Sequence, residues 1–375
     1  MKTPPASSVY DVIADRSRYC VVTGDCRKEV TKLASNSVHS LITDAPFELG
    51  YMSADWDRTG VAYDVGLWKE CRRVVKPGGH LLVFASTRTY HRMACAVENA
   101  GFQIRDQLTW LFATGFNKVG YIKQRDGSHV LPGWGGSLKP ACEPILIARK
   151  PYSGTLAKNL STHGTGGFNV DACRVELPAG DPLHKGVKHQ RHKLDTAGQG
   201  WGFVALDREP GLWRWPANVL HDGSPEVCKA FASYKASTKF YKCCPFDQDD
   251  VALNRIFFSG KASPRDRDEG LAHLTGVNAK KGRLNTHPTV KPTSLMRYLA
   301  RLVTPANGVV LDMFTGAGST GKAAMLEGFR FLGFELCASY ARIARARIEH
   351  VIREQQRASH RIGQSDQGGG LNRAP

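Results

Sequence analysis

The sequence lacks the paired-cysteine motifs of metal clusters and redox centres. Its ten cysteines are scattered apart from the adjacent Cys243 and Cys244, and no two of them have a C-x-x-C spacing. That spacing is the usual signature of structural zinc sites and of dithiol redox pairs. We therefore expect no metal, and free thiols kept reduced in a cytoplasm.

Long apolar runs are also missing. No stretch approaches the roughly 18–20 consecutive apolar residues that a membrane span requires. The segment from Met1 to Arg16 lacks the basic and then apolar layout of a signal peptide. We therefore expect no membrane partner.

Acidic residues are scarce relative to basic ones. The 375 residues contain 34 Asp and Glu against 51 Lys and Arg, which gives a net charge of +17 at pH 7. Hydrophobic residues make up 42% and charged residues 23%, an ordinary globular composition. A neutral metabolite does not require such an excess of cations, whereas a polyanion does, and nucleic acid is the leading candidate. A basic protein that is merely soluble is the alternative that charge leaves open.

Residues 1–150 alternate short apolar runs with helix-like stretches. Apolar residues at helical spacing predict a helix over Val61–Val75, and the segment KPGG at 76–79 predicts a turn into the next strand. Continuous apolar runs predict buried strands at Val38–Thr43, His80–Phe84 and Cys142–Ala148. This rhythm is typical of a doubly wound α/β sheet.

The same rhythm returns at residues 282–357. We expect helices at Thr293–Val303, Ser319–Leu326 and from about Cys337 to Arg357, with strands at Gly308–Asp312 and Phe329–Phe334. Residues 358–375 include three consecutive glycines and are expected to form a disordered tail. The sequence thus predicts an α/β fold, a doubly wound, mostly parallel Rossmann-like sheet built from both ends of the chain.

Between these halves, residues 151–281 have poor periodicity and frequent Gly, His, Lys, Arg and Trp. Four cations lie in one stretch of this segment: Lys185, Lys188, Arg191 and Lys193. A loop-rich basic insertion of this kind is suited to contact a substrate and to place cations on phosphates. A solvated loop without such a contact is the alternative for each single residue.

A glycine-rich turn follows the predicted strand that ends at Asp312. The segment from Gly316 to Lys322 (GAGSTGK) meets the G-x-x-x-x-G-K pattern of a phosphate loop, but Ala323 replaces the Ser or Thr that holds Mg²⁺. It also meets the G-x-G-x-x-G pattern of a dinucleotide turn, which is a weak signal alone. The third interpretation is a site for S-adenosylmethionine (SAM), which can approach the backbone N–H groups at the start of the following helix.

A carboxylate at the end of the next strand favours the SAM site. Glu335 ends the segment FRFLGFE, where it can accept hydrogen bonds from both ribose hydroxyls of the cofactor. Because SAM has no phosphate, Lys322 has no ligand to bind and is expected to face solvent. An ordinary acidic residue at a helix N-terminus is the alternative for Glu335.

A second element follows the predicted strand that begins at Val38. Asp44, Ala45, Pro46 and Phe47 come at its end, and the proline biases Ala45 toward an extended backbone. The Asp44 carboxylate and the Ala45 carbonyl are then two acceptors beside the flat ring of Phe47. They suit a planar base whose exocyclic NH₂ group donates one hydrogen to each acceptor while the base stacks on the ring. A capping Asp in a strand-end turn is the alternative.

Together, the two elements resemble the motifs of amino-methyltransferases that act on DNA, in the permuted class where D-P-P-Y precedes F-x-G-x-G. Here the motifs read DAPF at 44–47 and FTGAG at 314–318. The segment HPTVKP at 287–292 is similar to the family's H-P-T-x-K-P, and WPANVLHD at 215–222 resembles a segment of phage and prophage members. The chain departs from the pattern where Ala45 replaces the usual Pro and Phe47 the usual Tyr.

The resemblance implies a SAM-dependent enzyme that flips adenine out of duplex DNA and methylates its exocyclic N6, because an Asp-first motif usually accompanies this target. No metal is required. It implies catalytic roles for Asp44, Ala45, Pro46 and Phe47. It implies cofactor contacts for Asp25, Thr289, Lys291, Asp312, Phe314, Gly316, Gly318, Ser319, Thr320 and Glu335. Residues 151–281 would be the inserted target-recognition region.

Other functions stay open. The same catalytic core can serve cytosine N4 in DNA or an amine in RNA, and a P-loop nucleotide-binding protein or a non-catalytic DNA-binding relative are more remote alternatives. The resemblance also implies double-stranded DNA as the partner and a bacterial cytoplasm, or that of a phage's host, as the location. A homodimer and a cognate restriction nuclease are further expectations.

Overall fold

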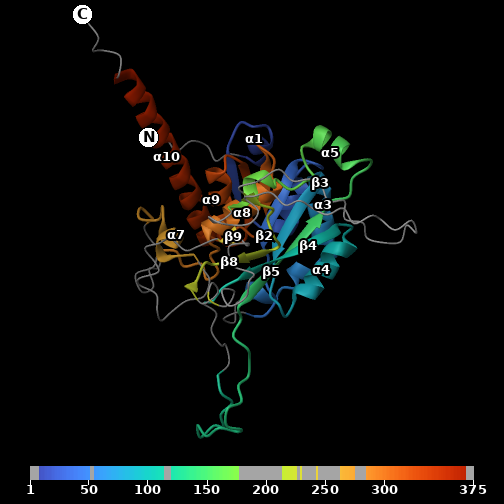
Figure 1. The fold of residues 1–375 in the computed structure, drawn as a ribbon, viewed down its shortest axis with the longest axis vertical. Helices are drawn as coiled ribbons and strands as arrows, with labels where there is room; N and C mark the ends of the chain where they lie inside the picture. The colour runs from blue at the N-terminus through green and yellow to red at the C-terminus, as the bar shows by residue number, and fades with distance from the viewer. Residues whose placement is uncertain are drawn as a thin grey trace, which may run out of the picture.

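In the computed structural model, the residues described are 8–50, 55–113, 120–176, 213–225, 229, 242–243, 262–274 and 284–368. Figure 1 shows a central sheet with helices on both faces, a long C-terminal helix, and an arm that leaves the body at the opposite end. The four cations expected to contact DNA, Lys185, Lys188, Arg191 and Lys193, lie outside the described residues.

One mixed sheet forms the centre of the described part. Its nine strands have the order β1-β11-β10-β2-β3-β5-β4-β8-β9. Neighbouring strands run parallel, except that β5 is antiparallel to both β3 and β4. The predicted doubly wound, mostly parallel sheet is therefore confirmed. The strands are β1 Tyr19–Thr23, β2 Val38–Asp44, β3 Val75–Phe84, β4 Gln103–Leu111, β5 Cys142–Arg149, β8 Val219–His221, β9 Lys242–Cys243, β10 Val309–Asp312 and β11 Arg330–Glu335.

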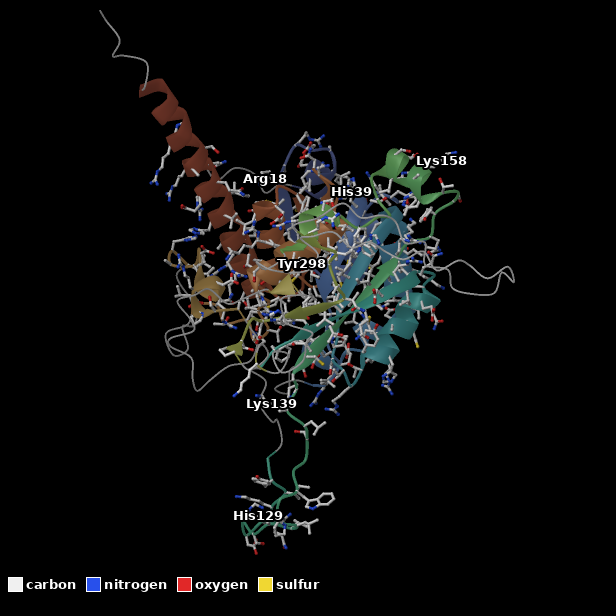
Figure 2. All side chains as sticks on the ribbon, in the orientation of Figure 1. Arg18, His39, His129, Lys139, Lys158 and Tyr298 are labelled. Atoms are coloured by element: carbon white, nitrogen blue, oxygen red, sulfur yellow. The ribbon has the colours of Figure 1, made fainter. Side chains whose placement is uncertain are left out.

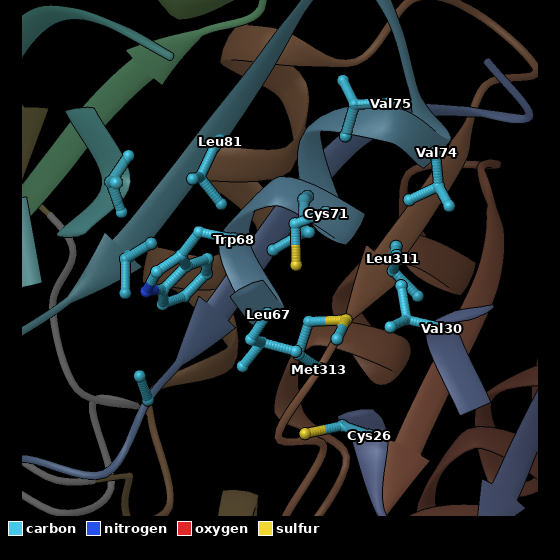
Figure 3. Close-up of a cluster of buried hydrophobic side chains, with 14 of the residues drawn as sticks. Cys26, Val30, Leu67, Trp68, Cys71, Val74, Val75, Leu81, Leu311 and Met313 are labelled. Carbon is cyan, nitrogen blue, oxygen red and sulfur yellow. The ribbon is translucent and has the colours of Figure 1, made fainter. Parts of the chain in front are cut away.

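Helices bury both faces of this sheet, which explains why its strands are continuous apolar runs. Leu41 and Ile42 are adjacent in β2, yet they belong to two separate core layers on opposite faces. On the Leu41 face, Trp68 and Cys71 of one helix pack against Leu81 of β3 (Figure 3). The helices of that face are α3 Val65–Val74 and α4 Tyr90–Asn99, and those of the other are α8 Thr293–Val303, α9 Ser319–Leu326 and α10 Ala338–Gly368.

Segments from residues 151–281 pack on the body. Helix α5 Leu156–His163 lies beside β3, where the amide of Asn159 donates to the carbonyl of Pro77 at 3.0 Å. Strand β8 extends the sheet beyond β4, and helix α7 Pro264–Asp268 lies against α9 and α10. The remaining short elements are α1 Val9–Ile13, α2 Cys26–Glu29, η1 Val30–Lys32, η3 Asp55–Arg58, η4 Val61–Tyr63, η5 Asp171–Cys173, β6 Val175–Glu176 and β7 Trp213–Arg214.

The region before β3 differs from the sequence prediction in two ways. The helix expected from Val61 begins at Val65, because Asp64 caps it by accepting from the backbone N–H groups of Gly66 and Leu67 at 2.8 and 3.2 Å. The KPGG segment expected to be a turn belongs to β3. Its backbone bonds to Lys150, just past β5, and these two hydrogen bonds extend the ladder through the glycines.

The C-terminal helix corrects the expected disordered tail. Helix α10 continues past Arg357 to Gly368, so residues 358–368 are helical. Extending an existing helix costs far less than starting one, and this stretch contains no proline to stop it. Residues 369–375 lie outside the described residues.

Candidate active site

The site lies where the order of the strands reverses. Strands β10 and β2 are neighbours at the centre of the sheet, with Leu311 opposite Leu41. The chain continues from β10 to β11 on one side, and from β2 to β3 on the other. Ligands of open α/β sheets bind at such a point, outside the carboxyl ends of the strands. The hydroxyl of Thr43 donates to the carboxylate of Asp312 at 2.6 Å and joins the two strand ends directly.

The loops after both strands line one cavity of about 410 Å³. Its volume is within the range of small-molecule sites, about 300–1,000 Å³. Among its walls are all four residues of the DAPF motif, Asp44, Ala45, Pro46 and Phe47. Nine of the predicted cofactor residues also line it: Asp25, Thr289, Lys291, Asp312, Phe314, Gly316, Ser319, Thr320 and Glu335.

Gly318, the tenth residue predicted to contact the cofactor, is not among the residues that line this cavity. Its φ is +77°, and a Cβ added there would lie 2.8 Å from the Cα of Ala344 in α10. The glycine at this position is therefore required by helix packing. Gly316, with φ +51°, does face the cavity, and an added Cβ would lie 2.8 Å from Nε2 of His287.

Glu335 holds the glycine turn in place. One of its carboxylate oxygens accepts from the backbone N–H of Gly316 at 2.7 Å, and the other accepts from that of Cys337 at 2.8 Å. Burial raises the pKa of this carboxyl above its ordinary value, although both hydrogen bonds oppose the shift. Because a carboxylate oxygen can accept two hydrogen bonds, Glu335 retains acceptor capacity for a ligand.

Asp312 shapes the start of the same turn. Its carboxylate accepts from the hydroxyl of Thr43 and from the backbone N–H of Phe314 at 3.1 Å. Complete burial raises the pKa of Asp312 to about 6, and the nearby charge of Asp44 adds to the shift. Asp312 therefore connects the two motifs as well as facing the cavity.

A buried lysine in the wall of the same cavity joins two carboxylates. The ammonium of Lys291 lies 2.7 Å from Asp44 and 3.2 Å from Glu143, which is in β5. Burial opposes the charged form of Lys291, but the two carboxylates outweigh this effect and raise its pKa. The three groups carry a net negative charge in total. The structure thus places Lys291 in direct contact with the DAPF motif.

Aromatic rings surround these charges. The Lys291 ammonium lies 5.4 Å from the ring centre of Phe47 and 4.9 Å from that of Phe84. Trp110 and Phe112 also line the cavity, with ring centres 5.2 Å apart. A flat apolar ligand with a polar edge fits such a pocket, because its faces meet rings while its edge meets carboxylates.

The loop after the DAPF motif is fixed by a buried aspartate. Asp57 is 1% exposed and accepts from the backbone N–H groups of Glu48 and Leu49 at 2.9 and 3.2 Å. The hydroxyl of Thr89 donates to the carbonyl of Phe47 at 2.9 Å. The backbone at and after Phe47 is therefore held by two separate parts of the chain.

Two predicted cofactor residues have local partners. Asp25 caps α2 and binds the guanidinium of Arg27, which lowers the pKa of the Asp25 carboxyl. The backbone N–H of Thr289 donates to the imidazole of His287 at 3.3 Å. Both residues still line the cavity, so these bonds orient the walls of the site.

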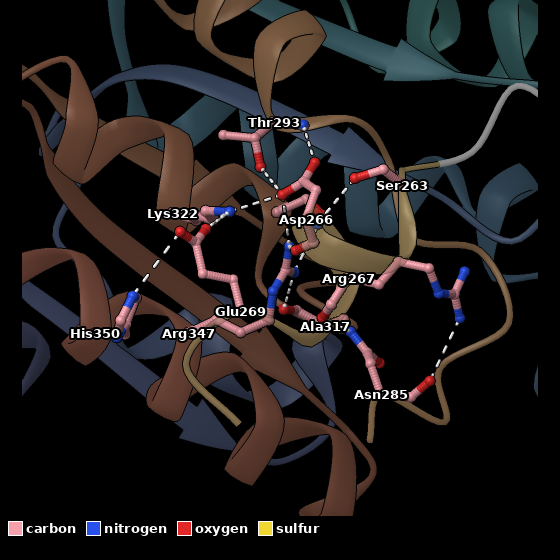
Figure 4. A network of polar contacts seen from close by, with 11 residues as sticks. Ser263, Asp266, Arg267, Glu269, Asn285, Thr293, Ala317, Lys322, Arg347 and His350 are labelled. Atoms are coloured by element: carbon pink, nitrogen blue, oxygen red, sulfur yellow. Dashed lines mark hydrogen bonds and ion pairs between the residues drawn. The ribbon is translucent and has the colours of Figure 1, made fainter. Parts of the chain in front are cut away.

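Lys322 is buried and does not face solvent, which corrects the sequence prediction. Its ammonium pairs with Asp266 at 2.7 Å and with Glu269 (Figure 4). Burial raises the pKa of Asp266, but Lys322 and Arg347 hold it below its ordinary value. The two carboxylates that pair with Lys322 come from a segment more than 50 residues away, so no local sequence pattern predicts this ion pair. With its charge taken by carboxylates, Lys322 is not available to a phosphate, which argues against a P-loop.

Arg347 extends this network to the glycine turn. The side chain is fully buried in α10 and donates to the carbonyl of Ala317 at 2.6 Å and to that of Asp266 at 2.8 Å. Sequence reasoning missed both Arg347 and Glu143. Glu143 opens the apolar strand CEPILIA, where an unexpected charge was the available signal.

Two features are absent from the described residues. No helix among them is long and apolar enough to cross a lipid bilayer. In the same residues, no group of three or more His, Cys, Asp or Glu side chains is arranged to hold a metal ion.

Comparisons with known proteins find one matching family and several similar chains. Residues 38–346 match the N6/N4 methyltransferase family described as "DNA methylase". The DNA adenine methyltransferase YhdJ of Escherichia coli is 32% identical, over 88% of this chain and 82% of the relative. The type II methyltransferase M.HindIII of Haemophilus influenzae is 28% identical over 41% of this chain, and the match spans 65% of that relative, slightly under two thirds. The solved PvuII DNA methyltransferase (cytosine-N4-specific) has a TM-score of 0.49 and 13% identity, covering 88% of this chain and 86% of its own.

Proposed function

Because this chain belongs to the N6/N4 DNA methylase family, we propose that it transfers a methyl group from SAM to the N6 amine of adenine in duplex DNA. One observation carries the assignment of residues: the DAPF motif and the glycine turn with Glu335 line the same cavity. A methyl donor and an acceptor base bound there would react as one unit, and such proximity supplies a large part of the rate.

The chain's residues fit the cofactor at the end of the cavity formed by β10 and β11. The Glu335 carboxylate would accept hydrogen bonds from the ribose hydroxyls in addition to those that it receives from the backbone. Gly316 lets the ligand approach the backbone, and Ser319 and Thr320 at the start of α9 suit the methionine end. When bound, SAM supplies an electrophilic methyl carbon on its sulfonium.

The residues of the other end would hold and activate the base. An aromatic amine is a poor nucleophile because its lone pair is delocalised into the ring. The NH₂ group donates to the Asp44 carboxylate and the Ala45 carbonyl, which favours an electron-rich nitrogen, while the ring stacks on Phe47. The Lys291 ammonium pairs with both Asp44 and Glu143, so the three groups together have a net negative formal charge. That charge stabilises the positive charge that develops on the nitrogen.

Adenine is the favoured target over cytosine. The motif begins with Asp44, and in the family an Asp-first motif usually accompanies adenine N6. The similarity to YhdJ, named a DNA adenine methyltransferase, supports the same choice. Reaching the amine requires the base to leave the duplex, at a cost of a few kcal/mol for unstacking. Cytosine N4 stays the second candidate because the family covers both targets.

Labelled SAM and mixed-sequence DNA test the proposal directly. We expect the wild type to label DNA, and digestion to nucleosides to yield N6-methyladenine. Asp44→Ala should abolish labelling while SAM binding, measured by calorimetry, stays nearly intact. Asp171→Ala is the matched control, because this carboxylate is 85% exposed and outside the cavity.

Each contrary result identifies another function. N4-methylcytosine alone would replace the target, and labelling that persists in Asp44→Ala would contradict the catalytic assignment. Bound SAM without methyl transfer would indicate a non-catalytic relative, and ATP hydrolysis without SAM binding would indicate a P-loop protein. A homodimer and a cognate restriction nuclease stay predictions.

A further inference from the structure

An arm of residues 120–141 projects from the body between β4 and β5 (Figures 1 and 2). Its two limbs are antiparallel, with bridges joining Tyr121 to Gly135 and Lys123 to His129. At the tip, the backbone N–H of Gly127 donates to the carbonyl of Gln124 at 3.0 Å, and Gly127 has φ +87°. The arm therefore has a defined hairpin course held by its own backbone bonds.

The arm exposes an unusual share of apolar surface. Among the described residues, thirteen large hydrophobic side chains are exposed, and six of them lie on the arm: Tyr121, Ile122, Val130, Leu131, Trp134 and Leu138. Trp134 is 63% exposed and Leu138 is 93% exposed. Apolar groups gathered on one projection mark an interaction surface, since a soluble protein gains nothing by exposing them together.

The charge of the arm identifies the kind of partner. Its exposed cations are Lys123, Arg125 and Lys139, against a single carboxylate on Asp126. That carboxylate accepts from the backbone N–H and the hydroxyl of Ser128 at 2.9 and 2.6 Å, so it is already engaged within the turn. Cations interleaved with aromatic residues suit a nucleic acid, whereas lysine is depleted in interfaces between proteins.

The stem of the arm is part of the proposed base pocket. Phe112, Pro140 and Cys142 line the cavity. The backbone N–H of Phe112 donates to the carbonyl of Ala141 at 2.9 Å and closes the stem beside it. DNA that delivers a base into this cavity must therefore pass next to the point where the arm begins.

We propose that this arm binds duplex DNA next to the target base and lies in the major groove of the duplex. The inference rests on the proposed function, in which duplex DNA is the substrate. The major groove, about 12 Å wide, admits a two-stranded β-ribbon. Lys123, Arg125 and Lys139 contact phosphates, while Trp134 and its apolar neighbours contact the groove.

DNA binding by matched variants tests the arm. We expect Lys123→Ala/Arg125→Ala to raise the Kd for DNA roughly tenfold and to reduce the slope of log K against log salt by about 2, because two phosphate contacts are lost. Lys69→Ala/Lys158→Ala removes the same charge from α3 and α5 and should leave the slope unchanged (Figure 2 places Lys158 far from the arm).

A second pair of variants tests the apolar contact. Trp134→Ala should raise the Kd roughly tenfold at an unchanged salt slope, because it removes no charge. Tyr10→Ala on α1, which is 59% exposed, is the control and should leave the Kd unchanged. SAM affinity and the urea midpoint should match the wild type in all four variants, which shows that each one folds.

The contrary outcomes separate the arm from the proposed function. Equal salt slopes in the arm and control variants, with methylation retained, would overturn the arm proposal alone. A dimer that dissociates in Trp134→Ala while its DNA affinity stays that of the wild type would also overturn it, by making the arm a contact between copies. A wild type that binds DNA with the expected arm dependence yet transfers no methyl group would instead contradict the proposed function.

Discussion

Two glycines with the same backbone angle should respond very differently to alanine. Gly318 and Gly328 both have φ +77°, at the start and just past the end of α9. A Cβ on Gly318 would lie 2.8 Å from the Cα and 2.9 Å from the Cβ of Ala344, whereas a Cβ on Gly328 meets nothing within 4 Å. The comparison therefore separates a packing effect from backbone strain.

The two costs are of known size. An L-residue in the left-handed region costs about 1–2 kcal/mol, and this cost applies to both positions. Forcing a methyl group into a filled contact costs about 1–3 kcal/mol more. We expect Gly328→Ala to lower the free energy of unfolding by about 1–2 kcal/mol and Gly318→Ala by about 2–5 kcal/mol. The gain from a stiffer unfolded chain is common to both variants and cancels in the difference.

Urea denaturation followed by circular dichroism measures the difference. With the denaturant slope m equal in both variants, the shift in midpoint reports stability alone. A Gly318→Ala variant as stable as Gly328→Ala, within about 0.5 kcal/mol, would refute the packing of α9 on α10 at Ala344. It would also return Gly318 to the role of a cofactor glycine, which a loss of SAM affinity without loss of stability would confirm.

Three further predictions concern the buried charges. The pKa of Asp312 is raised to about 6 in the folded protein, so ionisation of this carboxyl opposes folding. The stability that its protonated form contributes is fully present below about pH 4 and is lost as the pH rises through 6. From pH 4 to pH 7 the free energy of unfolding of the wild type should fall by about 2 kcal/mol relative to that of Asp312→Asn, as measured by urea denaturation. Free energies of unfolding that change in parallel with pH in the two proteins would contradict this. Lys322→Met should cost about 3 kcal/mol of stability because Asp266 loses a buried counter-charge, and the double variant with Asp266→Asn should cost less than the sum of the single variants in the same assay. Glu143→Gln should lower kcat about tenfold with SAM affinity unchanged, because Lys291 then neutralises the pocket, and an unchanged kcat in a methylation assay would rule this role out.

Local patterns in the sequence predicted the sheet and both motif loops. The strand Val38–Thr43 is one residue shorter than β2, and the helices Thr293–Val303 and Ser319–Leu326 have the bounds of α8 and α9. These elements are buried on both faces or on one clear face, so the spacing of their apolar residues predicts whether each is a strand or a helix. The meeting of the two motif loops in one cavity followed from the carboxyl ends of parallel strands.

Ion pairs between residues far apart in the sequence could not be predicted from such local patterns. Lys322 looked like a solvent-facing lysine because its partner Asp266 lies 56 residues earlier in the chain. Glu143 reaches Lys291 only when β5 runs antiparallel beside β3, a pairing that the strand sequences do not encode. The arm after β4 could not be predicted for a related reason. Its residues are exposed and are not packed on the body, so their sequence has no periodic apolar pattern.

The hydrogen bond between Thr43 and Asp312 joins residues that the ribosome adds 269 positions apart. During synthesis, β2 therefore emerges long before the strand that pairs with its inner edge. That edge stays open until almost the whole polypeptide exists, and an unpaired strand edge invites association with other chains. Production of this protein should accordingly depend on how quickly translation finishes or on a chaperone that shields the nascent sheet, because the cofactor cannot stabilise a pocket whose second wall has not yet been made.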